Sequence, residues 1–192
     1  MHIQYLDDTP DVVSLRSTSL YLRDFELADW PAVHHYAMDA EVTRFMAWGP
    51  NTAEQTLTFI THAVKNAHTT PRLSYDLAVI HAATHSLIGG AGLYIRQDRR
   101  FEAEIGYCLQ KEVWGRGYGA EIARLLVRLG FDHLHLHRLI ATCDPENIGS
   151  VRVLEKAGFQ REGLMRSHLK TRSGWRNSYL YAIVVTDPRL MC

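Results

Sequence analysis

The order in which the apolar residues change their spacing constrains the fold of this chain more than any other feature. In the middle of the sequence, residues 75–80, 87–95 and 103–109 form short runs rich in apolar and β-branched residues, which predict strands. Turn-forming residues at 83–86 and 97–100 separate these runs. Three consecutive strands with such short connections indicate an antiparallel meander.

The segment after the meander changes from a strand period to a helical one and back. Residues 118–132 place a polar stripe opposite an apolar face, which predicts a helix that packs on the sheet. A short apolar strand at 138–143 and a second helix at 148–156 follow. This order indicates a parallel crossover, and two further strands are predicted around 159–169 and 175–185.

The first third of the chain predicts one strand followed by helices. The strand covers residues 20–23, and Asp24 is a candidate cap for the helical stretch that follows it. Another helix is predicted at 52–68, with Asn51 or Thr52 as its cap. Together with the later elements, this order predicts a mixed α/β sheet.

Length and charge exclude several classes of protein. At 192 residues the chain is expected to form one domain, residues 1–192, that buries a core without disulfides or a structural metal. Hydrophobic residues make up 46% and charged residues 22%, which is typical of soluble globular proteins. The 21 basic and 21 acidic side chains cancel, which argues against nucleic acid or an anionic membrane as a partner.

The terminus and the cysteines predict a cytoplasmic protein. Residues 1–17 are weakly patterned and lack the features of a signal peptide, and no apolar run approaches about 20 residues. Cys108, Cys143 and Cys192 are odd in number and widely spaced, which fits neither a disulfide framework nor a zinc site. Cys108 and Cys143 lie in apolar strands, so we interpret them as small buried hydrophobes rather than nucleophiles.

Three histidines recur at alternate positions before the strand at 138–143. His133, His135 and His137 have the spacing of one strand face. We interpret them as a polar edge that leads into the strand rather than as metal ligands, and no metal is expected.

A glycine-rich run between a predicted strand and a helix is the strongest local signal for chemistry. Gly115, Gly117 and Gly119 alternate at the start of the helix predicted at 118–132. Such a run directs unpaired backbone N–H groups and the positive end of the helix dipole toward one point, where phosphate binds well. It lacks the pattern of a P-loop, and GxGxG differs from the GxGxxG of dinucleotide-binding folds. By itself it leaves two alternatives, a phosphate site or a turn without a ligand.

Three motifs in the same order resemble the GNAT superfamily of N-acetyltransferases. They comprise residues 107–109 with 114–121, residues 147–159, and residues 162, 163 and 166. Within that superfamily they resemble the RimJ/RimL-like branch of ribosomal-protein N-terminal acetyltransferases. Further similarity upstream extends the match to about residues 18–187.

This resemblance implies the fold and the co-substrate. The GNAT fold is a mixed, mostly antiparallel sheet of about seven strands with helices on both faces, in which the fourth and fifth strands splay apart. Acetyl-CoA is the implied co-substrate, with its pantetheine arm in the splay and its pyrophosphate on the glycine run. The implied binding residues are Cys108, Leu109, Trp114, Gly115, Arg116, Gly117, Tyr118, Gly119, Ala120, Asn147 and Ser150.

Trp114 is typical of one branch of the superfamily, and Arg116 and Asn147 each have two interpretations. Trp114 stands where most of the superfamily carries Gln or Arg, and tryptophan there is typical of the RimJ/RimL-like branch. Arg116 has two interpretations, a contact to phosphate or a solvated loop arginine. Asn147 is a predicted helix cap and also a candidate contact to the pantetheine arm.

The resemblance also suggests catalytic residues. Glu104 is the candidate base for the amine, because desolvation raises the pKa of a carboxylate toward neutrality; the alternative is a carboxylate that faces solvent or pairs with an arginine. Leu154 replaces the tyrosine that protonates the leaving thiolate in many relatives. Ser150 is the matching candidate in this branch, or else a first-turn serine that bonds to the backbone. A backbone N–H near Cys108 or Leu109 is the expected donor to the thioester carbonyl.

The implied acceptor is a primary amine, in the first place the α-amino group of a protein or peptide. A small-molecule amine, such as an antibiotic or metabolite, and a non-catalytic CoA-binding module are the alternatives. Arg166, His168, Trp175 and Asn177 are candidates for the acceptor side, or are merely solvated. A homodimer is suggested by the resemblance alone.

Overall fold

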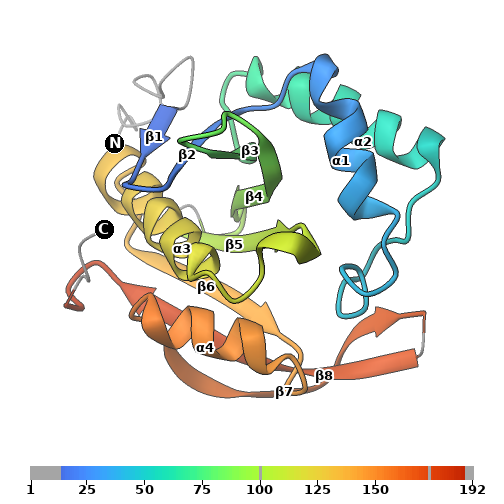
Figure 1. The fold of residues 1–192 in the computed structure, drawn as a ribbon. Helices are drawn as coiled ribbons and strands as arrows, with labels where there is room; N and C mark the ends of the chain where they lie inside the picture. Colours follow the sequence, from blue (N-terminus) through green and yellow to red (C-terminus); the bar gives the residue numbers. More distant parts are fainter. Residues whose placement is uncertain (1–13, 100, 173, 189–192) are drawn as a thin grey trace.

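The structure is a computed structural model that describes residues 14–99, 101–172 and 174–188. These residues form an eight-stranded sheet in the order β1-β2-β3-β4-β5-β6-β8-β7 (Figure 1). The strands are β1 (Ser14–Arg16), β2 (Leu20–Asp24), β3 (Ser74–His81), β4 (Leu87–Ile95), β5 (Glu102–Leu109), β6 (Arg138–Cys143), β7 (Gln160–Thr171) and β8 (Gly174–Val184). The α-helices are α1 (Trp30–Ala37), α2 (Ala53–Ala67), α3 (Tyr118–Arg128) and α4 (Ile148–Lys156).

The sheet confirms the predicted meander and crossover. Strands β2 to β5 are antiparallel neighbours, and α3 connects β5 to the parallel strand β6. The additional strand is β1, three residues long, in the segment where the sequence shows no clear pattern. Because β1 comes first, the predicted splay of the fourth and fifth strands lies here between β5 and β6.

The splay is visible in the register of the strands. β5 pairs with β6 only from Glu102↔Arg138 to Glu104↔Ile140. Beyond that point β6 continues to pair with β8, as far as Cys143↔Tyr179. The sheet therefore divides after Glu104, and we call the opening between β5 and β6 the fork.

Helices cover both faces of the sheet, as predicted (Figure 1). On one face Val33 and Tyr36 of α1 and Ile60 of α2 pack against Ala78 and Ile80 of β3. On the other face α3 and α4 pack on a larger core, which contains Ile122, Leu125, Leu126 and Leu154. Burial of these apolar faces is the main force that holds the helices on the sheet.

Local signals explain where most helices begin. Thr52 caps α2 by accepting the Gln55 N–H, while the Gln55 side chain accepts the Thr52 N–H, which is a full capping box.

At 15 residues α2 is the longest of the described helices, and none of them has the length and apolar character needed to cross a membrane.

The predicted cap at Asp24 is wrong. Asp24 ends β2 and forms an ion pair with the buried guanidinium of Arg72. The helical segment begins instead with a 3-10 turn, Leu27–Asp29, which Glu26 caps. Arg23 then holds the Asp29 carboxylate with two hydrogen bonds of 2.7 Å. A tertiary ion pair has thus displaced the local capping interaction.

The strand spacing inferred for the three alternating histidines is wrong, although all three are exposed, as expected of a polar edge before the strand. After α3 the chain continues as a π-helical turn, Leu129–His133, because Leu129 and Phe131 remain in the core. His135 has a left-handed backbone with φ 50°. His133 therefore closes a helical turn, and strand geometry starts only at Arg138.

Candidate functional site

The fork is closed at one end by ion pairs. The guanidinium of Arg138 on β6 bonds to the buried carboxylate of Glu102 on β5 at 2.9 Å and to Glu162 on β7 at 2.8 Å. Glu104 stands at the last paired position of β5, where it is half-buried. Its Oε1 accepts a hydrogen bond of 3.2 Å from Thr142 Oγ1, beyond the last pair on β6. A carboxylate therefore lies where the two strands begin to separate.

Tyr107 and Ser150 meet across the other side of the fork. The hydroxyl of Tyr107 on β5 lies 2.9 Å from Ser150 Oγ in the first turn of α4. Asn147 Oδ1 accepts the Ser150 N–H at 3.0 Å, which confirms Asn147 as the cap of α4. Burial raises the pKa of the Tyr107 phenol, so this hydroxyl stays protonated at neutral pH.

Strand parity puts these groups on opposite faces. Glu104 and Cys108 are an even number of residues apart, and Cys108 packs in the core beneath α1 and α2. Tyr107 has the opposite parity and packs against the core beneath α3 and α4. The fork thus offers a carboxylate on one face and a pair of hydroxyls on the other.

The glycine run has room for an anion. Gly115 and Gly117 adopt φ values of +78° and +87°, and no atom lies within 4 Å of the place where a Cβ would stand on either residue. Gly117 is the N-cap of α3 and has no side chain to bond the first amides of this 11-residue helix. Open space therefore adjoins unprotected backbone donors and the positive end of a helix dipole.

The neighbouring residues hold this loop in place. The Trp114 indole N–H donates to the Leu109 carbonyl at 2.9 Å, which ties the loop to the end of β5. Gly119 lies so close to α4 that a Cβ would stand 2.7 Å from a methyl group of Val153. The exposed guanidinium of Arg116 bonds to the Glu112 carbonyl at 3.3 Å, so this side chain folds onto its own loop.

Tyr118 and Ala120 contribute their backbone alone to this loop. The Tyr118 ring lies against His81, with ring centroids 5.7 Å apart, and Ala120 is buried. The residues predicted to bind the co-substrate thus come from three segments. These are the end of β5 (Cys108 and Leu109), the loop and first turn of α3 (residues 114–120), and the start of α4 (its N-cap Asn147, and Ser150).

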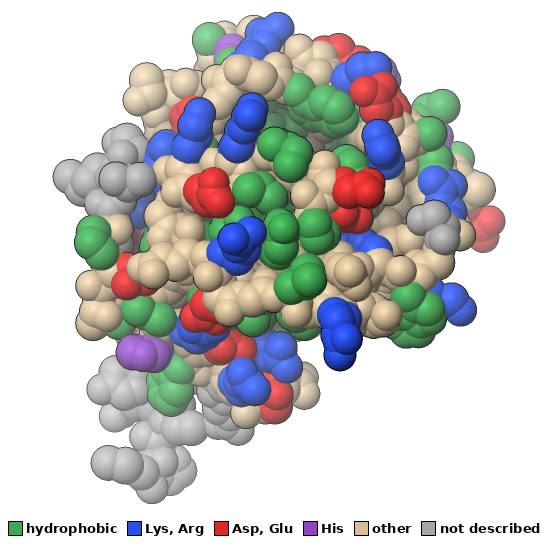
Figure 2. Space-filling view, turned by 90° about the horizontal axis from the view of Figure 1, so that it is seen from below, with side chains coloured by type: hydrophobic (Ala, Val, Ile, Leu, Met, Phe, Trp, Pro, Cys, Tyr) green, Lys and Arg blue, Asp and Glu red, His purple; other side chains and the backbone are tan. Residues whose placement is uncertain are grey.

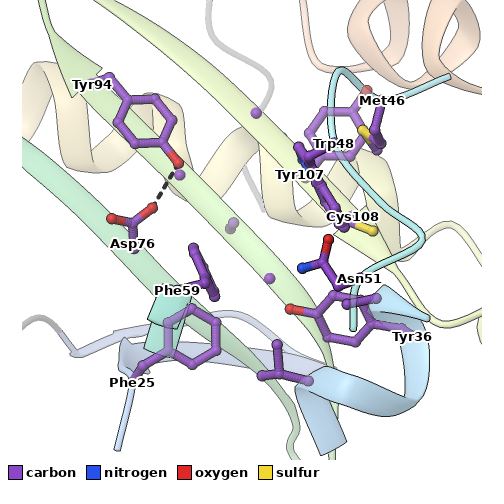
Figure 3. Close-up of a pocket in the computed structure, with 16 residues that line it drawn as sticks. Phe25, Tyr36, Met46, Trp48, Asn51, Phe59, Asp76, Tyr94, Tyr107 and Cys108 are labelled. Carbon is purple, nitrogen blue, oxygen red and sulfur yellow. Dashed lines mark hydrogen bonds between the residues drawn. The ribbon is translucent and has the colours of Figure 1, made fainter. Parts of the chain in front are cut away.

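A cavity of about 230 Å³ lies on the face of the sheet beneath α1 and α2. Its floor is the backbone of Gly90 and Gly92 on β4 and Gly106 on β5, which are adjacent in the sheet. Aromatic and apolar side chains form the walls, as Figure 3 shows. The wall residues on this face are Phe25, Val33, Tyr36, Ala37, Met46, Trp48, Phe59 and Cys108, and Tyr107, whose side chain packs on the opposite face, also borders the cavity.

Asp76 is the one charged side chain among the described residues that line this cavity. Its carboxylate accepts a hydrogen bond from the Tyr94 hydroxyl at 2.7 Å (Figure 3). It accepts another from the Ser74 hydroxyl at 3.1 Å. Desolvation, and then the Asp76 charge, raise the pKa of the Tyr94 phenol. Tyr94 is therefore a protonated donor that fixes the carboxylate.

Cys108 also faces the cavity, but as a thiol. Burial raises its pKa to about 12, and burial raises that of Cys143 to about 11. Both values lie far above neutral pH, where a nucleophilic cysteine would need a depressed pKa. This agrees with the interpretation of both residues as small buried hydrophobes.

The loop that carries Met46 and Trp48 is attached to the far end of the sheet. Arg176 on β8 donates to the Phe45 carbonyl at 2.7 Å and lies 3.7 Å from the Asp144 carboxylate at the end of β6. One arginine thus links the loop before α2 to the strand that forms one side of the fork.

The candidates in the β7–β8 hairpin lie elsewhere. Arg166, His168, Trp175 and Asn177 are not among the residues that line the cavity. Asn177 Oδ1 accepts the N–H of Ser167, and His168 bonds to the Ser178 hydroxyl at 3.1 Å. These contacts stabilise an irregular stretch of β7, where the register with β8 shifts.

Sequence reasoning did not identify Asp76, Tyr94 or Tyr107 as site residues. Each lies in an apolar strand, where an aromatic residue usually indicates core and a single acidic residue usually indicates an exposed position. The sequence does contain one indication of this site. Asp76 is a carboxylate inside a predicted strand, and the next predicted strand has glycines at the alternate positions 90 and 92.

Charges of both signs surround the hydrophobic groups on the surface. Figure 2 shows hydrophobic side chains gathered near the middle of one face, bordered by Lys or Arg and by Asp or Glu side chains. This distribution agrees with the balance of 21 basic and 21 acidic residues.

Comparison with known sequences gives this geometry a context. A family model described as "Acetyltransferase (GNAT) domain" matches residues 19–160. The chain is 34% identical over 166 residues to "Uncharacterized N-acetyltransferase YnaD" of Bacillus subtilis, which covers 86% of this chain and 93% of that protein. A shorter match, 29% identical over 83 residues and 43% of each protein, is to the ribosomal protein uS5-alanine N-acetyltransferase of Escherichia coli.

Solved structures share the fold. An acetyltransferase of the GNAT family from Bacillus anthracis has a TM-score of 0.79 and 31% identity, covering 90% of this chain and 98% of that chain. RimJ of Mycobacterium smegmatis, solved in complex with CoA-disulfide, has a TM-score of 0.77 at 21% identity, covering 91% of this chain and 87% of that chain. At 21% identity the second likeness shows the fold alone.

Proposed function

Because this chain belongs to the GNAT family of acetyltransferases and is therefore an N-acetyltransferase, we propose that it moves the acetyl group of acetyl-CoA to the α-amino group of a protein or peptide. The observation that carries the proposal is the fork, with Glu104 on one face and Ser150 on the other. The family uses acetyl-CoA, and a relative in the same branch has been solved with a CoA compound.

The residues of this chain fit the parts of that co-substrate. The backbone of residues 114–120 has donors and open space for a pyrophosphate, and nothing occupies the Cβ positions of Gly115 and Gly117. Between Gly106 and Leu109, the peptide groups of β5 that point away from β4 are not paired with β6. Except for the Leu109 carbonyl, which accepts the Trp114 indole N–H, we assign them to the pantetheine arm and the thioester carbonyl. Arg116 lies on the loop and would have to leave the Glu112 carbonyl to reach a phosphate.

The acetyl transfer itself needs two proton movements. The amine nitrogen forms a bond to the acetyl carbon while the carbon–sulfur bond breaks, and the amine proton passes to Glu104 directly or through water. Ser150 gives its hydroxyl proton to the leaving thiolate and takes one back from solvent, while Glu104 releases the amine proton to solvent; Tyr107, 2.9 Å away, holds the Ser150 hydroxyl in place. The high pKa values of Cys108 and Cys143 support direct transfer without an acetyl-cysteine.

The acceptor class rests on two supports of different kinds. The matched Escherichia coli relative is named for acetylation of an alanine of ribosomal protein uS5, which supports a protein N-terminus. The apolar cavity of about 230 Å³ supports a small-molecule amine as the second candidate, because a cavity of this volume holds only a few chemical groups of a ligand.

An acceptor screen tests the proposal. The purified protein is mixed with acetyl-CoA and with peptides that carry a free or a blocked α-amine, and thiol release is followed together with the mass of the product. We expect turnover with free peptides and none with their blocked counterparts. Turnover restricted to small amines would favour the second candidate, and tight CoA binding without any turnover would favour a non-catalytic CoA-binding module.

A further inference from the structure

The cavity leads from the fork to a carboxylate that the acetyl transfer does not use. Asp76 on β3, Gly92 on β4 and Gly106 on β5 are paired across the sheet, so they form one row. Two strand spacings place the Cα of Asp76 about 10 Å from that of Gly106. Gly106 lies on the edge of β5 that faces the fork.

Neither glycine in the row between Asp76 and the fork has a side chain of its own, and the Tyr94 ring lies over Gly92. No atom lies within 4 Å of the Cβ position of Gly106. At Gly92 a Cβ would stand 2.4 Å from the Tyr94 hydroxyl, so glycine there makes room for the phenol that donates to Asp76. Gly106 thus leaves open space beside the fork, Gly92 accommodates the phenol that holds Asp76 in position, and both line the same cavity as Asp76.

Asp76 lacks a cationic partner within the protein. It forms no ion pair with a basic residue of the part of the chain that the structure describes. None of the described residues that line the cavity is Lys, Arg or His. A half-buried carboxylate held by two hydroxyl donors retains free lone pairs and an unbalanced charge, which a ligand cation would complement.

The walls beside Asp76 suit a cation on an apolar chain. Figure 3 shows Phe59 and Phe25 on the same side of the cavity as Asp76. Their rings pack edge to face at 5.6 Å. Aromatic rings bind methylene groups through apolar contact and attract ammonium or guanidinium groups through their quadrupole.

We propose that the cavity is an acceptor subsite that selects amines carrying a second cationic group, which Asp76 binds while the first amine reacts at the fork. This rests on the proposed acetyl transfer. An apolar spacer of roughly 6 to 9 Å separates the two nitrogens. This length is two strand spacings minus the distance by which the Asp76 carboxylate extends from its own strand. A peptide with a basic first residue and an α,ω-diamine share this chemistry.

Matched acceptors test this subsite. A peptide that begins with lysine is compared with the same peptide beginning with norleucine, and hexane-1,6-diamine is compared with hexylamine. Within each pair only the distal ammonium differs. We expect the cationic member to have a KM lower by about 10- to 100-fold, the range for a hydrogen bond to a charged group. The peptide and diamine arms show which source of the cation is used.

The Asp76→Asn variant separates binding of the distal cation from catalysis. The amide retains an acceptor for the Tyr94 hydroxyl but loses the charge, so the preference for the cationic member should disappear while kcat/KM for hexylamine and the norleucine peptide stays unchanged. Asp98→Asn is the matched control, since Asp98 is an exposed carboxylate at Arg96. The Asp98→Asn substitution should leave kcat/KM unchanged for both the cationic and the neutral acceptor of each pair.

Two outcomes would overturn the proposal. One is an equal kcat/KM for both members of each pair in the unmodified protein. The other is an Asp76→Asn variant that loses activity equally on both members. If no acceptor turns over, the acetyl transfer fails, and calorimetric titration of the CoA-loaded protein with both diamine and monoamine still tests the subsite. Equal affinities in that titration would exclude a cation site at Asp76.

Discussion

Two carboxylates on one face of the sheet have different neighbours and therefore different proposed tasks. Glu104 lies at the fork and accepts a hydrogen bond from Thr142 on the opposite strand, and it is the proposed base for the amine. Asp76 lies two strands away and is bonded by Tyr94 and Ser74. Their separate hydrogen-bond partners make the two roles testable one at a time.

Replacing Glu104 by Gln should remove the base and retain the shape. General bases contribute about 10²- to 10⁴-fold to the rate, so we expect kcat to fall within this range. The rate should then rise with pH, since free amine comes from solution. The measurement is kcat from pH 6 to pH 10 for Glu104→Gln and for the control Asp98→Asn. A Glu104→Gln rate within twofold of the unmodified protein would assign the base elsewhere.

Ser150 and Tyr107 should respond as a linked pair. Ser150→Ala removes the proton donor, and kcat is expected to fall by about 10²-fold or more while the Kd for CoA changes little. Tyr107→Phe removes only the hydrogen bond of 2.9 Å that orients Ser150, and a loss of about fivefold corresponds to one such bond. In the double variant the Tyr107 effect should vanish. Additive losses in steady-state kinetics would show that the two hydroxyls act independently.

At the scale of elements, the start of α3 is the proposed site for the pyrophosphate of the co-substrate. Gly117 has φ +87° and open space at its Cβ position. Gly117→Ala forces a left-handed alanine, at about 1–2 kcal/mol, and places a methyl group in the proposed pyrophosphate site.

We expect Gly117→Ala to weaken CoA binding by about tenfold or more, the cost of losing a hydrogen bond to a charged group, while the protein remains folded. Calorimetric titration with CoA and a thermal melt of the same sample measure both effects. Gly163→Ala is the control, because Gly163 also has open space but lies on β7 with no positive φ. Equal CoA affinity for the two variants would place the pyrophosphate elsewhere.

Elements were more predictable than the contacts between them. The strand at 87–95 and the helix at 148–156 are found with the predicted ends, since a local period of two or 3.6 residues fixes them. The cap at Asp24 failed because Arg72, 48 residues away, pairs with that carboxylate. Ser150 was proposed as a site residue through a motif, whereas its hydrogen-bond partner Tyr107 was not, because that contact forms only when β5 and α4 come together.

At the scale of the whole molecule, buried tyrosine and cysteine side chains make the free energy of unfolding depend on pH in the alkaline range. Burial raises the pKa of Tyr36, Tyr107, Cys108 and Cys143 above the usual 10.0 for tyrosine and 9.0 for cysteine. Between the usual and the raised value the unfolded chain releases these protons and the folded chain keeps them. The folded state then binds more protons, so the free energy of unfolding decreases as the pH rises.

We expect this free energy to be constant near pH 8 and to fall above pH 9, by up to about 1.4 kcal/mol per pH unit for each group fully in this window. Urea unfolding at several pH values measures the slope. Tyr36→Phe removes one group and should reduce the slope above pH 10. A free energy that does not change between pH 8 and pH 10.5, or an unchanged slope in the variant, would contradict this account.

The sequence by itself determined what depends on neighbours along the chain. Strand and helix order follow from the spacing of apolar residues, and the loop at Gly115 and Gly117 follows from the backbone conformations that glycine permits. Only the tertiary structure decided the cavity. The strand register places Asp76 in one row with Gly92 of β4 and Gly106 of β5, and Phe25 and Phe59 from other segments line the same cavity. No periodicity in the sequence encodes this arrangement of side chains, because it depends on how separate elements pack.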